Sequence, residues 1–276
     1  MTNLPELFNL QGRVAVVTGG AGLLGEQFCQ TLAEAGANIV VLDVNEPAAH
    51  ALVGKLSQMG AKAMAIPTDI TSPDSVQDMV EKTLKAFNRL DILVNSAALD
   101  PKFDPKNRGM QTTSGAFEDF PLEAWKQALD VNLTGTFLCC QAAVQPMLSQ
   151  GAGVIINVAS IYGLVGPDQR LYERDDSPLR VFKPVYYSVT KAGILGLTRY
   201  LATYYAGKNI RVNTLTPGGV YNNHDEIFSN AYAARAVLGR MAYKDEMNGA
   251  ILFLASDASA YMTGANLVVD GGWTAW

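Results

Sequence analysis

The sequence predicts an α/β fold, namely a single doubly wound domain with a parallel sheet of about seven strands and helices on both faces. Short β-branched runs alternate with helix-length segments along the chain, which is typical of repeated β-α units around a buried parallel sheet. The 276 residues are 49% hydrophobic and 17% charged, enough for one large core. No internal repeat or low-complexity linker interrupts the series. We therefore expect one domain spanning residues 1–276.

The elements follow from local pattern. Strands are expected where short runs of Val, Ile and Leu are bounded by turn-forming residues, and the apolar-periodic run from Ala192 to Tyr205 predicts a long helix. Two connections, near residues 99–120 and 166–185, exceed ordinary turns and each follows an expected strand. Ligands in such folds bind at the carboxyl ends of the strands, so both insertions should border the substrate site. The expected strands are Val14–Thr18, Asn38–Leu42, Lys62–Pro67, Ile92–Asn95, Gly153–Val158, Ile210–Thr216 and Asn266–Val269.

Composition argues against several function classes. The formal charge of −5 and the lack of a Lys/Arg block argue against nucleic-acid binding, which needs a basic face. Neither a signal-peptide pattern nor an apolar run long enough for a membrane helix occurs. The three cysteines, two of them adjacent at Cys139 and Cys140, predict reduced core residues of a cytoplasmic protein. His50 and His224 lack partners at metal spacing, so we expect both on the surface and no metal site.

A glycine-rich turn follows the first expected strand. Gly20, Gly22 and Gly25 fit the Gly-x-Gly-x-x-Gly dinucleotide fingerprint, in which the backbone approaches a pyrophosphate at a helix N-terminus. Asp43 closes the second strand eighteen residues after Gly25. Its carboxylate would bind a ribose 2′-hydroxyl and repel a 2′-phosphate, which favours NAD over NADP in a Rossmann-type domain. The competing interpretation is an ordinary turn and a capping acid.

Tyr187 and Lys191 stand four residues apart, so on a helix they share one face. A nearby ammonium favours the phenolate and lowers the pKa of the phenol, which would make Tyr187 a general base. Asn132 lies in an expected buried helix and needs hydrogen-bond partners, either as a structural bridge or as part of a site. Ser160 follows the fifth expected strand at the edge where ligands bind, and it could serve either as a helix cap or as a site residue. Asp69 precedes a helix expected to start near Ser72 or Pro73, and a turn and an adenine contact are equally compatible with it.

Taken in order, these motifs resemble the short-chain dehydrogenase/reductase family over Gly12 to Gly272, including Pro217-Gly218 and the ending Val269-Asp270-Gly271-Gly272. The resemblance implies that Tyr187 is the acid/base and that Lys191 lowers its pKa and binds the nicotinamide ribose. It implies that Ser160 holds the substrate oxygen and that Asn132 orders a relay water. The cofactor-binding residues it implies are Gly19, Gly20, Gly22, Leu23, Leu24, Gly25, Asp43, Asp69, Ile70, Asn95, Ala97, Tyr187, Lys191, Pro217, Gly218 and Val220.

Three features depart from the family pattern. The second glycine of the family's usual turn would fall at position 23, but this chain has Leu23 there and its glycine at Gly22. This glycine spacing occurs in the extended branch of the superfamily. Too few residues follow Lys191 for that branch's larger substrate domain. The threonine that commonly follows Pro-Gly is replaced near Val220. Ser160 and Tyr187 are farther apart than usual because of the insertion near 166–185.

The insertions carry several cations. Arginine forks suit phosphate or carboxylate, which indicates an anionic substrate. The interleaved acids Glu173, Asp175 and Asp176 leave open a solvated, self-paired loop or a subunit contact. The cations are Arg170, Arg174, Arg180 and Lys183 in the second insertion, and Lys102, Lys106 and Arg108 in the first.

The resemblance implies an NAD-dependent oxidoreductase that interconverts a secondary alcohol and a ketone on a polar sugar-like or sugar-acid substrate. One alternative is an oxidoreductase of bacterial surface-glycan biosynthesis, such as flagellin modification. A second alternative is a dinucleotide-binding regulator without catalysis. The family also implies a homotetramer or homodimer.

Overall fold

The computed structural model describes residues 3–100, 116–173 and 181–276. All seven expected strands form one parallel sheet in the order β3-β2-β1-β4-β5-β6-β7. β2 and β6 each extend one residue beyond expectation and β3 begins one residue later. The strands are β1 Val14–Thr18, β2 Asn38–Asp43, β3 Ala63–Pro67, β4 Ile92–Asn95, β5 Gly153–Val158, β6 Ile210–Pro217 and β7 Asn266–Val269.

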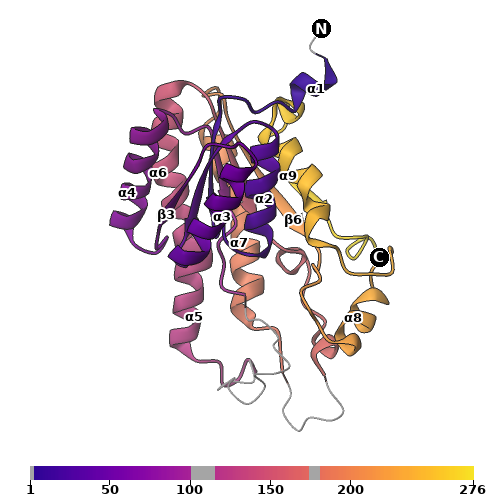
Figure 1. Ribbon diagram of the computed structural model, residues 1–276. Helices are drawn as coiled ribbons and strands as arrows, with labels where there is room; N and C mark the ends of the chain where they lie inside the picture. The colour runs from indigo at the N-terminus through magenta and orange to yellow at the C-terminus, as the bar shows by residue number, and fades with distance from the viewer. Residues whose placement is uncertain (1–2, 101–115, 174–180) are drawn as a thin grey trace.

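Helices connect the strands in the expected alternation (Figure 1). Ser72 caps the helix after β3 by accepting a hydrogen bond from the Ser75 N–H, and Pro73 is the first helical residue, as expected. The long helix expected around Ala192–Tyr205 runs from Val185 to Tyr204 and contains Tyr187 and Lys191 in its first two turns, as expected. The helices are α1 Leu4–Leu7, α2 Leu23–Glu34, α3 Glu46–Gln58, α4 Pro73–Phe87, α5 Leu122–Leu129, α6 Gly135–Gln150, α7 Val185–Tyr204, α8 Glu226–Ala233 and α9 Asn248–Ala255.

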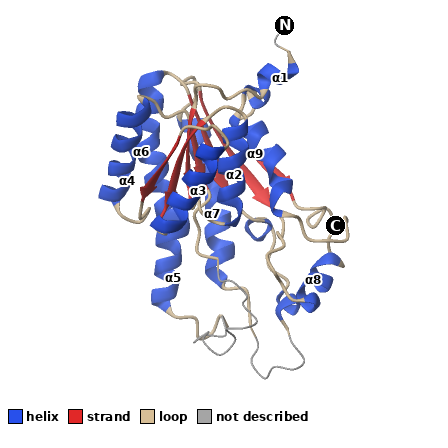
Figure 2. Ribbon diagram, in the orientation of Figure 1, coloured by secondary structure: helices blue, strands red, loops and turns tan. Residues whose placement is uncertain are grey.

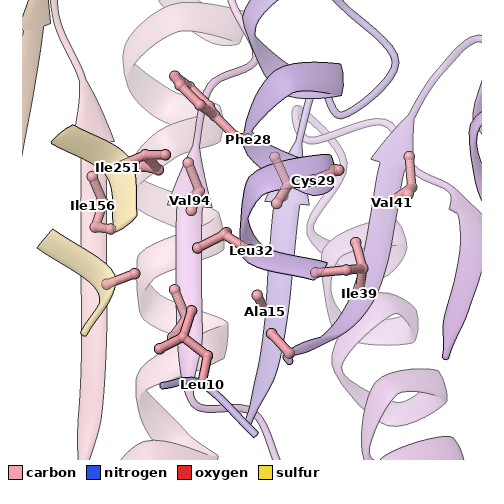
Figure 3. Packing of buried hydrophobic residues seen from close by; sticks show 14 of the residues in the cluster. Leu10, Ala15, Phe28, Cys29, Leu32, Ile39, Val41, Val94, Ile156 and Ile251 are labelled. Atoms are coloured by element: carbon pink, nitrogen blue, oxygen red, sulfur yellow. The ribbon is translucent and has the colours of Figure 1, made fainter. Parts of the chain in front are cut away.

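Helices flank the sheet on both faces (Figure 2), and a layer of buried apolar side chains lies on each face. Successive residues of a strand point to opposite faces, so Ala15 and Val17 pack with α2, α3 and α9, whereas Val14 and Val16 pack with α4, α6 and α7. Figure 3 shows the first layer, in which Phe28 and other side chains of α2 lie against the central strands. Both faces are buried, which explains why the strands are almost uninterrupted apolar runs.

The cysteines lie inside these layers, as expected. Cys29 of α2 belongs to one layer, Cys139 and Cys140 of α6 belong to the other, and none forms a disulfide. Burial raises the pKa of Cys140 to about 12, so its thiol stays protonated. Within the described ranges, no helix is long and apolar enough to cross a bilayer.

The carboxyl ends of the strands define the working edge of the sheet. The chain runs outward from β1 to β2 and β3, then returns to β4 on the other side of β1, so the order reverses between β1 and β4. Helices α5 and α8 lie toward this edge, and so does the N-terminal end of α7 (Figure 1). Three short turns complete it, namely the π-helical turn η2 (Asp130–Thr134) and the 3₁₀ turns η3 (Ile161–Gly163) and η4 (Gln169–Tyr172).

Candidate active site

The turn from β1 into α2 packs so closely that it requires glycine. Gly19 has a φ of +60°, and a Cβ built there would lie 2.8 Å from the Cα of Ala97, in the loop after β4. A Cβ on Gly25 would lie 2.1 Å from the Gly19 carbonyl oxygen. Gly22 is the N-cap of α2, and Leu23 and Leu24 are its first residues. The turn thus presents bare backbone at a helix N-terminus, a surface that fits a pyrophosphate.

Asp43 is attached to this turn. Its carboxylate accepts hydrogen bonds from the backbone N–H groups of Ala21 (3.1 Å) and Asn45 (2.9 Å). The backbone supports the same junction, because Gly20 donates to the Leu42 carbonyl (2.9 Å). The glycine cradle and an acid beside it at the end of β2 together fit a nicotinamide dinucleotide.

The residues after β4 close the other side of the turn. The Thr18 hydroxyl accepts hydrogen bonds from the N–H groups of Ser96 and Ala97, both at 3.1 Å. Asn95 is buried and donates through Nδ2 to Asn157 on β5 (2.8 Å), while its Oδ1 has no partner among the described residues. Asn95 therefore supports this edge from inside the fold.

Asp69 and Ile70 lie in the turn between β3 and α4. Asp69 is exposed and accepts hydrogen bonds from the N–H (2.9 Å) and hydroxyl (2.7 Å) of Thr71, which is the geometry of a side-chain-stabilised turn before α4. Ile70 is buried against Gly135, at the start of α6. The adenine contact of Asp69 remains a prediction.

Asn132 sits in the π-helical turn η2, between α5 and α6, and is 1% exposed. Its Oδ1 accepts from the Leu99 N–H (2.6 Å), and its Nδ2 donates to the Leu99 carbonyl (3.1 Å) and to Thr190 on α7 (3.3 Å). Both amide donors are engaged. Asn132 thus fixes the loop after β4 against α7, and π-helical turns frequently occur at functional sites.

Ser160, Tyr187 and Lys191 meet at the carboxyl edge. Ser160 caps η3 and also hydrogen-bonds to the side chain of Tyr187. Lys191 donates from Nζ to the Val158 carbonyl (2.8 Å), and its Nζ lies 5.8 Å from the centroid of the Tyr187 ring. The expected face shared by Tyr187 and Lys191 is therefore present. The neighbouring Tyr186 packs against Phe120 instead, with ring centroids 5.7 Å apart.

The electrostatics of Tyr187 differ from the sequence expectation. Burial raises the pKa of Tyr187 well above its ordinary value, and the carboxylate of Asp100 raises it further, while the hydrogen bond with Ser160 lowers it. Burial lowers the pKa of Lys191 to about 8. Four-residue spacing predicts which groups are neighbours, but it does not predict the cost of removing both from water.

A family model described as short chain dehydrogenase matches residues 13–172, and one described as Enoyl-(Acyl carrier protein) reductase matches residues 177–274. The chain belongs to the short-chain dehydrogenase/reductase family. It is accordingly an oxidoreductase of alcohols and ketones, as its relatives are.

Three relatives span nearly the whole chain. D-threitol dehydrogenase of Mycolicibacterium smegmatis is 36% identical over 99% of both chains. A gluconate 5-dehydrogenase from Burkholderia cenocepacia, solved with NADP and tartrate, is 29% identical with a TM-score of 0.85, covering 99% of this chain and 100% of its own. An NAD⁺-bound xylitol dehydrogenase is 27% identical with a TM-score of 0.81, covering 95% and 99%.

In this member of the short-chain dehydrogenase/reductase family, the loop after β6 is held without the usual threonine. Gly218 donates to the Val269 carbonyl (2.9 Å), directly beyond Pro217. The Gly219 N–H donates to the hydroxyl of Tyr232, and Val220 pairs with Ala242. Tyr232 and the Ala242 segment thus fix a loop that the sequence left without an anchor.

The structure describes only some of the cations that were expected to bind an anionic substrate. Arg170 is exposed and forms an ion pair with Asp168, which also pairs with Arg235. Arg174, Arg180, Lys102, Lys106 and Arg108 lie outside the described residues.

His50 and His224 were both expected on the surface. His50 is exposed, as expected. His224 is only partly exposed, and its ring stacks on Phe228 with ring centroids 4.9 Å apart. Burial lowers its pKa. The described residues hold no cluster of His, Cys, Asp or Glu suited to a metal ion.

Sequence reasoning missed two groups at the site. Asp100 was not singled out, and Lys183 was counted only among the cations of the insertion. The two form an ion pair beside Tyr187, and one or both of their charges act on the pKa values of Tyr187, Lys191 and His224. The position of Lys183, four residues before Tyr187, was the available signal.

Proposed function

We propose that this protein is an NAD-dependent dehydrogenase of polar, sugar-like secondary alcohols, acting in both directions between alcohol and ketone. The observation that carries the proposal is the meeting of Ser160, Tyr187 and Lys191 at the carboxyl edge of the sheet, the same edge that carries the glycine turn. A bound nicotinamide dinucleotide supplies the chemistry of hydride exchange with the carbinol carbon.

The protein's own residues handle the proton. In the oxidation, the Tyr187 phenolate takes the hydroxyl proton of the substrate, and in the reduction the phenol returns it to the carbonyl oxygen. Ser160 hydrogen-bonds to the same substrate oxygen, and Lys191 stabilises the phenolate by its charge. Asn132 holds the loop after β4 against α7 and so keeps this side of the site in place. Such acid–base assistance typically contributes about 10²–10⁴-fold.

The choice of NAD rests on Asp43. Its carboxylate stands beside the glycine turn, where it suits a ribose 2′-hydroxyl and opposes a 2′-phosphate. The xylitol dehydrogenase with bound NAD⁺ is consistent with this assignment, whereas the gluconate 5-dehydrogenase was solved with NADP. The effect of Asp43 on the preference for NAD over NADP therefore has to be measured in this protein.

Polyols are the substrates that we favour. Threitol and xylitol appear in the names of two relatives, and the described edge offers a paired carboxylate and ammonium, Asp100 and Lys183, that suit neutral hydroxyl groups. A sugar acid is the second candidate, because gluconate appears in the name of the third relative and Lys183 could pair with a carboxylate.

Tyr187→Phe tests the proposal. We expect at least about a 100-fold loss of kcat on every polyol that the wild type oxidises, with NADH binding retained, because the acid–base group alone is removed. Tyr186→Phe is the matched control and should keep its activity, since Tyr186 faces Phe120. A Tyr187→Phe enzyme with wild-type turnover would refute the assignment. A screen of polyols, aldonates and sugar phosphates with NAD identifies the substrate class.

We also infer a dimer or tetramer. Tyr200 and Tyr204 on α7 are exposed and stack with ring centroids 5.6 Å apart, and Phe137 on α6 is exposed as well. Aromatic side chains in such numbers are typical of interfaces. Light scattering after gel filtration measures the mass, and a monomer at micromolar concentration would contradict the inference.

A further inference from the structure

A second lysine contacts the candidate acid/base. Lys183 precedes α7 by two residues, and its Nζ lies 4.0 Å from the centroid of the Tyr187 ring, against 5.8 Å for Lys191. The side chain of Lys183 is only 11% exposed. An ammonium over an aromatic face is attracted by the ring, and the attraction grows when water is excluded. The attraction is larger still for a phenolate, whose negative charge is shared with the ring.

The insertion itself holds Lys183 in place. Gln169, near the start of the insertion, accepts from the Lys183 N–H (2.8 Å) and donates to the Lys183 carbonyl (3.2 Å). Its amide therefore satisfies both backbone groups of Lys183, near the end of the same insertion. The backbone from which the Lys183 side chain extends toward Tyr187 is therefore fixed.

A carboxylate from the other insertion opposes Lys183. Asp100, in the loop after β4, forms an ion pair with the Lys183 ammonium, and its side chain is 52% exposed. The side chain of Asn132 hydrogen-bonds to both backbone groups of Leu99. Because Leu99 directly precedes Asp100, these bonds also hold the backbone at Asp100 in place. The two insertions thus bring opposite charges to one side of Tyr187.

The effect on Tyr187 has a definite sign for each charge. Asp100 raises the pKa of Tyr187, whereas a cation against its ring favours ionisation. Ser160 contributes a hydrogen bond that favours ionisation. Among the described residues, the other titratable groups whose pKa values involve this pair or Tyr187 are Tyr162 of η3, Tyr172 of η4, Tyr186 and Lys191 of α7, and His224 before α8.

We propose that Lys183 and Asp100 act on Tyr187 as an opposed pair of positioning residues, the ammonium favouring the phenolate and the carboxylate disfavouring it. The proposal rests on the role proposed for Tyr187 as acid/base. It adds a second cation to the one that the Tyr-x-x-x-Lys motif supplies, and it assigns a purpose to the long spacing between Ser160 and Tyr187.

Titration of the phenol itself tests this pair without cofactor or substrate. Tyr187 is replaced by 3,5-difluorotyrosine, whose phenol ionises at lower pH, and its ¹⁹F resonance is followed against pH in the free protein. Lys183→Met should raise the pKa of this phenol by about one unit, because a desolvated cation is lost. Asp100→Asn should lower it, by less, because Asp100 is half exposed and its charge is screened. Lys183→Arg should restore the wild-type value.

Lys82→Met is the matched control, since Lys82 pairs with Asp78 on the exposed surface of α4. It should leave the ¹⁹F titration unchanged. Shifts of the same sign in Lys183→Met and Asp100→Asn, or no shift in Lys183→Met, would overturn the proposal. The acid limb of the kcat–pH profile should move in the same two directions.

The two proposals fail separately. Opposite ¹⁹F shifts in a protein that oxidises no polyol would support the pair and contradict the proposed substrate. Unmoved ¹⁹F titrations in an active dehydrogenase would contradict the pair alone.

Discussion

Replacing Lys191 with methionine should make the folded protein more stable at neutral pH while it removes activity. Lys191 is 4% exposed, and burial lowers the pKa of its ammonium from 10.5 to about 8. This value already includes a partial offset from the Asp100 carboxylate and a smaller lowering of the pKa by the Lys183 ammonium. The folded state therefore holds a buried charge that the unfolded state leaves in water.

The size follows from the pKa values. A lysine whose pKa falls from 10.5 unfolded to about 8 folded destabilises the native state by roughly 3 kcal/mol below pH 8, where both states are protonated. Between about pH 8 and 10.5 the unfolded state holds more protons, so the cost disappears as pH rises. Methionine also loses the hydrogen bond to the Val158 carbonyl, worth about 1 kcal/mol. The net gain for Lys191→Met is about 2 kcal/mol near pH 7.

Urea unfolding of the wild type and Lys191→Met at several pH values measures this difference. The advantage of the variant should shrink steadily above about pH 8, vanish near about pH 10 and reverse slightly at higher pH, where only the lost hydrogen bond remains. Lys82→Met, which removes an exposed cation, should show no such trend. A wild type that is more stable than Lys191→Met at pH 7, or a difference independent of pH, would refute the reasoning.

Two further substitutions probe the cofactor site and the interior. Asp43→Asn should weaken NAD binding by about 10–100-fold and reduce the discrimination against NADP, because a charged acceptor for a ribose hydroxyl is lost; calorimetric titration with both dinucleotides measures this, and an unchanged preference would contradict the role of Asp43. Asn157→Ala should lower the free energy of unfolding by about 2 kcal/mol, since it removes one hydrogen bond from the buried Asn95 and one from the buried Thr198. A urea midpoint equal to that of the wild type would argue against this network.

The strands could be predicted because burial on both faces imposes an apolar run of limited length. Their ends could not be fixed as well. Asp43 is polar and would be read as the first loop residue, but it stays in register with Pro67 of β3 and so belongs to β2. Hydrogen bonding to the neighbouring strand decides such an end, and a single strand's sequence does not contain that neighbour.

The candidate site divides in the same way. Ser160, Tyr187 and Lys191 could be named from the residues and their order, and the structure brings them together. The contact between Asp100 and Lys183 could not, since it joins two insertions far apart in the chain. The raised pKa of Tyr187 was equally hidden, because desolvation depends on packing from several elements rather than on spacing along one helix.

The site therefore combines two costs that oppose each other. Burial keeps Tyr187 un-ionised and pushes Lys191 toward its neutral form, although a general base needs the phenolate and its stabilisation needs the ammonium. One buried lysine is poorly suited to meet both demands. A second ammonium, held by Gln169 and partly matched by Asp100, favours the phenolate without burying another uncompensated charge. Burial of Lys191 lowers the stability of the fold but places one cation near the Tyr187 phenol. The insertion between Ser160 and Tyr187 places a second cation, Lys183, beside the same phenol. Both features therefore serve the ionisation of Tyr187.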